Sequence, residues 1–336
     1  MAWLFGKTFN PEKDVGDLTG KTILVTGGMS SRSRDLRYTE RRPCRFTTFL
    51  LTNLPGNNGL GLASVRALCA HNARLFLAAR TPSKGEAAIA SIKETVPNAN
   101  ITCLELDLSS FSSIAKAVET FTASSDRLDV LMNNAGVMLL PPSLTKDGYE
   151  IQFGTNHMGH ALLTKLLLPT LNKTAKQSGS DVRVVNLTSG GHALAPKGGL
   201  ILEKDTTALS EYSGWTLYGQ SKLANILFTR ELAKRYPSIK SMAVNPGSVD
   251  TALSTPWRTA NSWWASPLVY LVKPLLKTPE QGALTQIWAA TSPEAKTGTY
   301  YVPVAQESAG SAYSRDEKLA REMWDWTENE FSKHGY

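Results

Sequence analysis

The chain has 336 residues, of which 42% are hydrophobic and 19% are charged, and this composition is typical of a soluble globular protein. Its formal net charge of +7 raises the question of nucleic-acid binding. Residues 29–56 hold six arginines against Asp35 and Glu40, a net charge of +4, so only +3 remains for the other residues. That charge is too small and too dispersed for a surface that follows nucleic-acid phosphates, and it argues against this class of partner.

The first predicted element is a fully apolar strand over 22–26, and a helix over 59–71 is predicted next. The apolar residues of this helix recur every three or four positions, as the helical period requires. Without residues 29–56, the chain reads Thr26-Gly27-x-x-x-Gly59-x-Gly61 between strand and helix. Such glycines let backbone amides approach a pyrophosphate at the positive end of a helix, so the pattern predicts a nucleotide-binding turn.

The segment 29–56 interrupts this predicted turn and shows no hydrophobic period. A long structureless loop is unusual inside a turn whose function depends on its tightness. The residues at the two ends, Gly28-Met29-Ser30 and Pro55-Gly56, can be encoded by sequences that resemble intron borders. An unspliced intron of 28 codons, read in frame, therefore accounts for the segment. The alternative is a genuine loop lodged in the turn, and sequencing of the transcript distinguishes the two.

Further strands are predicted over 74–79, 101–106, 128–133, 182–187, 240–245 and 298–303, with helical patterns between them that include 83–96, 157–171 and 218–236. Continuous apolar strands that alternate with helices predict an α/β fold with a doubly wound, parallel, seven-stranded sheet of the Rossmann type. No internal repeat or linker divides the chain. We therefore predict one domain over 20–305, interrupted by 29–56, with a C-terminal helical extension over 306–336.

Polar residues follow two of the predicted strands and recur on one helix. Asn133-Asn134-Ala135-Gly136 ends the fourth strand, and Ser189 follows the fifth, where a hydroxyl can polarise a carbonyl group. Tyr218 and Lys222 lie one helical turn apart, so both side chains leave the same helix face. A nearby ammonium lowers the pKa of a phenol from its free value of about 10, and this pair therefore predicts proton transfer.

With Asn156 and Asn245-Pro246-Gly247, these motifs resemble, in order and spacing, those of the short-chain dehydrogenase/reductase family. The resemblance covers residues 20–304 apart from the interruption. The segments NHMGH (156–160) and SKLANILFTREL (221–232) resemble the branch of retinol dehydrogenases and WW-domain oxidoreductases, although no WW module is present. The lead-in FNPEKDVGDLTGK favours a fungal relative that acts in specialised metabolism.

The resemblance implies four catalytic residues. Tyr218 would be the general acid in reduction, and Ser189 would bind the substrate oxygen. Lys222 would bind the nicotinamide ribose and lower the pKa of the tyrosine, and Asn156 would hold a water that links Lys222 to solvent. The residues implied at the cofactor are Thr26, Gly27, Asn58, Gly59, Leu60, Gly61, Arg80, Asp107, Asn134, Ala135, Gly136, Tyr218, Lys222, Pro246, Gly247, Val249 and Thr251.

Arg80 determines the predicted cofactor. The second strand ends in Ala79-Arg80-Thr81, without the acidic residue that commonly binds the ribose 2′-hydroxyl of NAD. The fork of a guanidinium suits a 2′-phosphate instead. We therefore expect NADP, the alternative being a surface arginine without this role.

The sequence thus predicts an NADP(H)-dependent oxidoreductase that interconverts a carbonyl and an alcohol on an apolar molecule of retinoid, steroid or specialised-metabolite type. An alternative is a catalytically impaired or non-catalytic nucleotide-binding protein, in which the segment 29–56 disrupts the turn. A homo-oligomer and a peripheral membrane contact through the run 259–272 are compatible with the sequence. The apolar residues expected in a substrate lid are Trp257, Trp263, Trp264, Leu268, Tyr270 and Leu271.

Other residues favour ordinary structural roles. The three cysteines show no zinc-ligand spacing and the N-terminus has no signal-like apolar run, so an intracellular, cytoplasmic location is expected. His157 and His160 lie three residues apart without a third ligand, so no metal site is predicted. His192 either faces the pocket or caps a turn. One face of the C-terminal extension carries Leu319, Met323 and Trp326, which predicts a docked helix.

Overall fold

The structure of the protein is a computed structural model that describes residues 8–27, 59–202, 206–249 and 276–336. Segment 29–56, Asn58, Thr251 and the aromatic residues of the predicted lid lie outside the described residues. The expectations for these positions therefore stay predictions.

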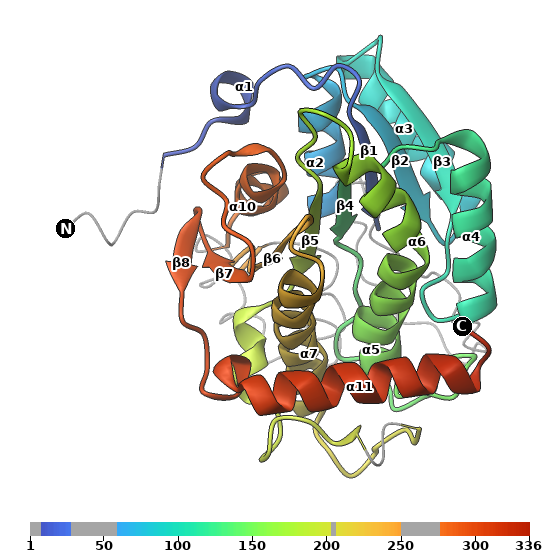
Figure 1. Cartoon of the computed structure of the whole chain (residues 1–336), viewed down its shortest axis with the longest axis vertical. Helices are drawn as coiled ribbons and strands as arrows, with labels where there is room; N and C mark the ends of the chain where they lie inside the picture. The colour runs from blue at the N-terminus through green and yellow to red at the C-terminus, as the bar shows by residue number, and fades with distance from the viewer. Residues whose placement is uncertain (1–7, 28–58, 203–205, 250–275) are drawn as a thin grey trace, which may run out of the picture.

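An eight-stranded sheet in the order β3-β2-β1-β4-β5-β6-β7-β8 forms the centre of the molecule (Figure 1). Its strands are β1 (Thr22–Thr26), β2 (Arg74–Ala79), β3 (Asn100–Glu105), β4 (Val130–Asn133), β5 (Arg183–Leu187), β6 (Lys240–Val244), β7 (Thr299–Val302) and β8 (Gln306–Ser308). Neighbouring strands run parallel except β7 and β8, which are antiparallel. The seven predicted parallel strands are confirmed. The short β8 was not predicted, because three residues are too few to show a strand period.

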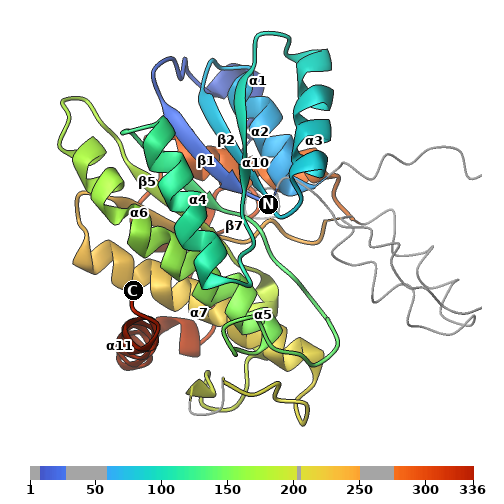
Figure 2. The ribbon, with the colours of Figure 1, turned by 90° about the vertical axis from the view of Figure 1, so that its right-hand side faces the viewer.

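Helices cover both faces of the sheet, with α2, α3 and α10 on one side and α4, α6 and α7 on the other (Figure 2). Their bounds are α2 (Leu60–Cys69), α3 (Pro82–Thr95), α10 (Pro279–Thr291), α4 (Phe111–Ser124), α6 (Gly159–Ala175) and α7 (Gly214–Arg235). The short α1 (Pro11–Asp14) precedes the sheet and α5 (Ile151–Phe153) precedes α6. Among the described helices, none is long and apolar enough to cross a membrane.

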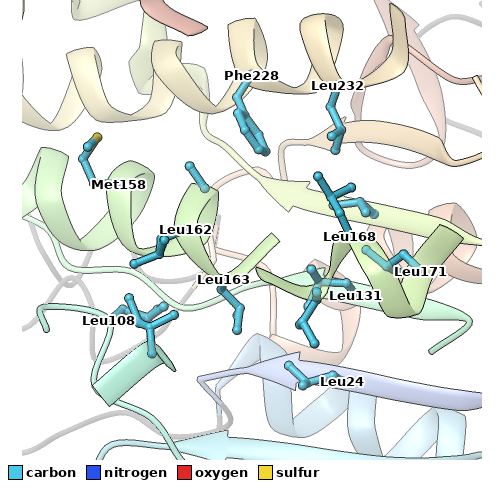
Figure 3. Close-up of a cluster of buried hydrophobic side chains, with 14 of the residues drawn as sticks. Leu24, Leu108, Leu131, Met158, Leu162, Leu163, Leu168, Leu171, Phe228 and Leu232 are labelled. Atoms are coloured by element: carbon cyan, nitrogen blue, oxygen red, sulfur yellow. The ribbon is translucent and has the colours of Figure 1, made fainter. Parts of the chain in front are cut away.

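The alternation of side chains along β1 explains why its three central residues are all apolar. Leu24 packs with the helices α4, α6 and α7, whereas Ile23 and Val25 pack with α2, α3 and α10. Figure 3 shows Leu24 and Leu131 facing the leucines of α6. Because both faces are covered, every position of the strand is buried. The strand β3, at the edge of the sheet, instead alternates between more and less exposed residues.

The last helix, α11 (Glu317–Lys333), lies across α7 and α6 (Figure 1). Met323 is fully buried, and Trp324 stacks on Phe228 of α7 with 5.2 Å between ring centroids. Leu319 and Trp326 pack partly buried against the same core. The C-terminal helix is therefore docked, as expected. The segment 306–336 is not wholly helical, because it begins with β8, which extends the sheet.

Candidate active site

A cavity of about 300 Å³ lies where the carboxyl ends of β1 to β5 meet the first turns of α7. The strand order changes direction between β1 and β4, and open α/β sheets bind ligands at such a point. Twelve of the residues predicted at the cofactor line this cavity. They are Thr26, Gly27, Gly59, Leu60, Arg80, Asp107, Asn134, Ala135, Gly136, Tyr218, Lys222 and Pro246.

The turn after β1 requires glycine at two positions. Gly27 has φ +69°, and a Cβ there would lie 2.7 Å from Cβ of Ala135. A Cβ on Gly61 would collide with the carbonyl oxygen of Gly27 and lie 2.6 Å from Nδ2 of Asn134. Gly59 is the N-cap of α2 and its residue type offers no capping side chain, so no side-chain bond caps that helix. The first N–H groups of α2 thus lack a side-chain partner, as an anion site at a helix N-terminus needs.

The Asn-Asn-Ala-Gly turn is bound to the end of β1. Oγ1 of Thr26 accepts bonds from the main-chain nitrogens of Asn134 and Ala135, each at 3.0 Å. In return, Nδ2 of Asn134 donates to the carbonyl oxygens of Thr26 and Gly27 at 2.7 and 2.8 Å. Gln286 of α10 donates to Oδ1 of Asn134 at 3.3 Å. Sequence reasoning missed Gln286, because it lies 152 residues from its partner and belongs to no motif.

Tyr218 and Lys222 lie together on the buried side of α7, with exposed fractions of 6% and 4%. Ser189 caps a short 3-10 turn, Gly190–Leu194, where its hydroxyl accepts a bond from the nitrogen of Gly191 at 3.1 Å. A Cβ on Gly191 would lie 3.1 Å from Cε1 of Tyr218 and 3.4 Å from Oγ of Ser189. The two predicted catalytic hydroxyl-bearing residues therefore lie next to one another beside Gly191, and they share a hydrogen bond.

Burial sets the pKa values of this pair. It raises the pKa of Tyr218 to about 12, against the lowering effect of the hydrogen bond with Ser189. It also lowers the pKa of Lys222 to about 8. The pKa of the phenol is therefore raised overall, because desolvation of Tyr218 dominates, and the expected lowering effect of Lys222 stays a prediction. Nζ of Lys222 lies 5.7 Å from the centroid of the ring and donates to the carbonyl oxygen of Leu187 at 3.2 Å.

Asn156 lies in a π-helical turn, Gly154–Met158, between α5 and α6, and is fully buried. Its Oδ1 accepts from the nitrogen of Val137 at 2.8 Å, and its Nδ2 donates to the carbonyl oxygen of Val137 and to Oγ of Ser221. A Cβ on Gly136 would lie 3.2 Å from Oδ1 of Asn156 and 3.4 Å from Nζ of Lys222. Asn156 is thus near Lys222, as the resemblance implies, and its predicted bond to a water stays a prediction.

The histidines of α6 and its preceding turn point to separate partners. Nε2 of His157 lies 3.3 Å from Oγ1 of Thr327 on α11. His160 joins the main-chain oxygen of Asn156 to Oγ1 of Thr26, each at 2.9 Å. Burial lowers the pKa of these imidazoles to about 3 and about 4, so both are neutral at physiological pH. Nδ1 of His192 lies 2.8 Å from the main-chain oxygen of Ser189, so this side chain contacts the main chain of the turn that Ser189 caps.

The opposite end of the cavity carries exposed positive charge. Arg80 and Lys84 line it with Thr81, which begins α3 without a side-chain cap bond. Asp107 also lines it, but its carboxylate accepts two bonds from Ser109 and forms an ion pair with Lys146 at 3.1 Å. Burial alone would raise the pKa of Asp107, and these partners lower it overall. Lys84 was missed in the sequence, although its spacing of four residues from Arg80 was a usable signal.

The remaining predicted cofactor residues follow β6. Gly247 has φ +81° and donates its N–H to Oδ1 of Asn245 at 2.9 Å. Val249 forms a bridge with Lys277 and packs against Gly282 of α10, so it contacts the helix that also carries Gln286. These two residues and Gly61 support the walls and do not line the cavity within the described residues.

Comparison with known proteins agrees with this arrangement. The sequence profile of the short chain dehydrogenase family matches residues 54–262. The chain is 38% identical over 293 residues to the short-chain dehydrogenase/reductase drtF of Aspergillus calidoustus, covering 83% of this chain and 92% of the relative. It is also 38% identical over 273 residues to retinol dehydrogenase 12 of Mus musculus, covering 80% and 82%.

The fold also matches solved structures. A crystal structure of an uncharacterised protein from Mycobacterium paratuberculosis superimposes with a TM-score of 0.69 at 28% identity, covering 96% of this chain and 97% of that one. The profile match spans more than half of the chain, and the identity to both sequence relatives exceeds 30% over most of their length. The chain therefore belongs to the short-chain dehydrogenase/reductase family, on its branch of retinol-dehydrogenase-like oxidoreductases.

Proposed function

We propose that the protein is an NADP(H)-dependent oxidoreductase that interconverts a carbonyl and an alcohol on an apolar small molecule. Its family consists of oxidoreductases that act on CH–OH groups with nicotinamide cofactors. The observation that carries the proposal is one cavity with Tyr218 and Lys222 at one end and Arg80 and Lys84 at the other. A dinucleotide with a 2′-phosphate has reactive and charged ends that suit these two sets of residues.

The described residues fit such a cofactor. The uncapped N-terminus of α2 and the close approach of Gly27 and Gly61 form a cradle for a pyrophosphate. Oγ1 of Thr155 is buried without a hydrogen-bond partner among the described residues, although the residue lines the cavity. A bound ribose or base would offer that hydroxyl a partner. When bound, the nicotinamide supplies or accepts the hydride.

The chain itself supplies the proton and the orientation. In reduction, the Tyr218 hydroxyl donates its proton to the substrate oxygen, and the Ser189 hydroxyl donates a hydrogen bond to the same atom. A phenol with a raised pKa stays protonated until charge develops on that oxygen. The ammonium of Lys222 lies near the ring of Tyr218 and favours the phenolate that forms.

Three features support NADP over NAD. Arg80 and Lys84 provide two cations, and the N-terminus of α3 adds partial positive charge at Thr81. Asp107 is occupied by Ser109 and Lys146, so its carboxylate is not free for a ribose hydroxyl. This positive charge suits a 2′-phosphate, and Asp107 is the one carboxylate among the described residues that line the cavity.

An apolar substrate is supported by the side chains of Val137, Leu140 and Ile151, which line the same cavity. The identity to a protein named retinol dehydrogenase 12 points in the same direction. The test is turnover of NADPH and NADH by the full chain with a panel of apolar aldehydes and ketones. We expect NADPH to be oxidised faster than NADH. Turnover that Ser189→Ala leaves unchanged would contradict the proposed role of the site.

A second candidate is a protein impaired by segment 29–56. It is favoured by the family match, which begins at residue 54 and so does not include β1 or Gly27. Both the full chain and a form without Met29–Gly56 should be titrated with NADPH by calorimetry. Weak binding by the full chain and tight binding by the shorter form would support impairment. Equal, strong affinities would show that the segment is accommodated.

A further inference from the structure

His192 connects the predicted catalytic serine to the C-terminal part of the chain. The residue is 5% exposed. Nδ1 lies 2.8 Å from the main-chain oxygen of Ser189, and Nε2 lies 3.1 Å from the main-chain nitrogen of Ser311. The ring packs edge-on against Tyr300 of β7, with 5.3 Å between centroids. One side chain therefore joins the turn after β5 to the segment between β8 and α11.

These two partners fix the protonation state of His192. A carbonyl oxygen only accepts, so Nδ1 carries the proton that it donates to Ser189. A main-chain N–H only donates, so Nε2 is the unprotonated acceptor from Ser311. The imidazole is neutral in this arrangement. Protonation would place an N–H of the ring against the N–H of Ser311 and break that bond.

The geometry around Gly191 makes the position of Ser189 depend on this bridge. The hydroxyl of Ser189 accepts from the nitrogen of Gly191, and the ring of Tyr218 lies beside the same glycine, where its hydroxyl shares a hydrogen bond with Ser189. Nδ1 of His192 donates a hydrogen bond to the carbonyl oxygen of Ser189. A rotation of residues 189–191 would therefore move the serine hydroxyl relative to the phenol.

We propose that His192 is a positioning residue, which holds Ser189 beside Tyr218 for carbonyl reduction and does so only as the neutral Nδ1–H tautomer. The proposal rests on the proposed function, because that function assigns Ser189 to the substrate oxygen. It implies that acidic pH releases Ser311 from His192 and lowers turnover, while the cofactor cradle at α2 is unaffected.

The pKa of His192 is set by its burial and by one main-chain hydrogen bond. Burial lowers the pKa of His192, and the bond to Ser189 opposes that shift. No charged side chain of the described residues contributes to it. Tyr300 on β7 and Tyr218 on α7 are the titratable neighbours, and burial raises the pKa of both phenols. On β8, Glu307 is paired with Lys296.

The first experiment is the pH dependence of kcat for the full chain with NADPH and an apolar ketone. We expect the wild type to lose turnover below the ordinary imidazole pKa of about 6.5. His192→Phe keeps a ring against Tyr300 but loses both bonds, and should lower kcat by about ten- to a hundredfold. The KM for NADPH should change less than about twofold, since the cradle is separate.

A second variant covers the case in which His192→Phe does not fold. His192→Asn keeps a donor toward Ser189 and cannot be protonated in the acid pH range. It should therefore retain more turnover than His192→Phe. The acid loss should be absent from both variants and retained in the control His71→Asn. Wild-type turnover with an unchanged acid loss in His192→Phe or His192→Asn would overturn the proposal.

A direct readout does not depend on activity. The chain has five histidines, so nitrogen-15 NMR of the labelled imidazoles can be assigned by the signal missing from His192→Asn. We expect His192 to carry its proton on Nδ1 at neutral pH, and an Nε2–H tautomer would overturn the proposal. If Ser189→Ala and Tyr218→Phe both keep full turnover, the proposed function is wrong, and this inference, which rests on it, is wrong as well. If both are inactive while the His192 variants behave as wild type, only this inference fails.

Discussion

At the α7 end of the cavity, Tyr218, Lys222 and Asn156 are each no more than 6% exposed, whereas Arg80 and Lys84 at the other end are open to solvent. The buried groups are held by hydrogen bonds, mostly to main-chain atoms, and two of them have strongly shifted pKa values. The exposed cations form no ion pair within the described residues. Their charge would attract an anionic group such as the phosphate of the proposed cofactor.

This difference separates chemistry from recognition. A buried proton donor depends on its surroundings, because desolvation sets its pKa and fixed bonds set its direction. An exposed cation depends mainly on its charge, and salt screens it. Changes at the α7 end should therefore alter kcat and stability, and changes at the Arg80 end should alter the KM for the phosphorylated cofactor.

The largest expected effect is from Tyr218→Phe. Loss of the proton donor should lower kcat by about 10²- to 10⁴-fold, because the substrate oxygen then lacks its acid. The dissociation constant for NADPH should stay close to that of the wild type. Steady-state kinetics and calorimetry measure the two quantities. Tyr236→Phe, at the far end of the same helix, is the matched control, and wild-type turnover in Tyr218→Phe would contradict the assignment.

Lys222→Met should separate catalysis from stability. Burial of the charged amine costs free energy, and this cost lowers the pKa of Lys222 from 10.5 to about 8. After the lost bond to Leu187 is allowed for, Lys222→Met should raise the free energy of unfolding by about 2 kcal/mol at neutral pH while turnover falls.

The stability advantage of Lys222→Met should depend on pH, and the lowered pKa of Lys222 determines the direction of the change. The folded wild type releases the proton of Lys222 at lower pH than the unfolded chain, so its stability rises as pH increases from about 8 to 10.5. The advantage of Lys222→Met should shrink over that window. Denaturant unfolding at several pH values measures it, with the exposed Lys318→Met as control. An advantage that is constant with pH would exclude desolvation as the cause.

Arg80→Ala tests recognition at the other end. The KM for NADPH should rise about tenfold or more, since a charge-assisted bond to a phosphate is lost. Kinetics with NADH should change little, because NADH has no 2′-phosphate. The exposed Arg321→Ala on α11 is the control. Equal losses with the two cofactors would show that Arg80 supports the structure instead.

Lys84→Ala should give the smallest effect. Its ammonium lies one turn into α3 and binds as a point charge, so we expect a twofold to fivefold rise in the KM for NADPH, as roughly 1 kcal/mol or less implies. The rise should diminish at high salt. Cofactor kinetics at two ionic strengths measure it, and a salt-independent effect would argue for a packing role.

The positions of the parallel strands along the chain and the set of motifs were predictable from local patterns. Runs rich in apolar and β-branched residues, such as 22–26 and 182–187, indicate strands buried on both faces, and the structure places them at the centre of the sheet. The spacing of Tyr218 and Lys222 gave their common helix face, because helical periodicity is local. β8 escaped prediction, since its three residues show no period.

The sequence by itself determined which chemical groups the site contains, because each motif is a short run of residues whose side chains can be read directly. Only the tertiary structure decided what those groups do at a given pH. Burial raised the pKa of Tyr218 where the neighbouring Lys222 had predicted a fall, and burial is a sum over contacts from distant segments. The bonds from Gln286 to Asn134 and from Ser311 to His192 span more than a hundred residues each, so no local pattern could reveal them.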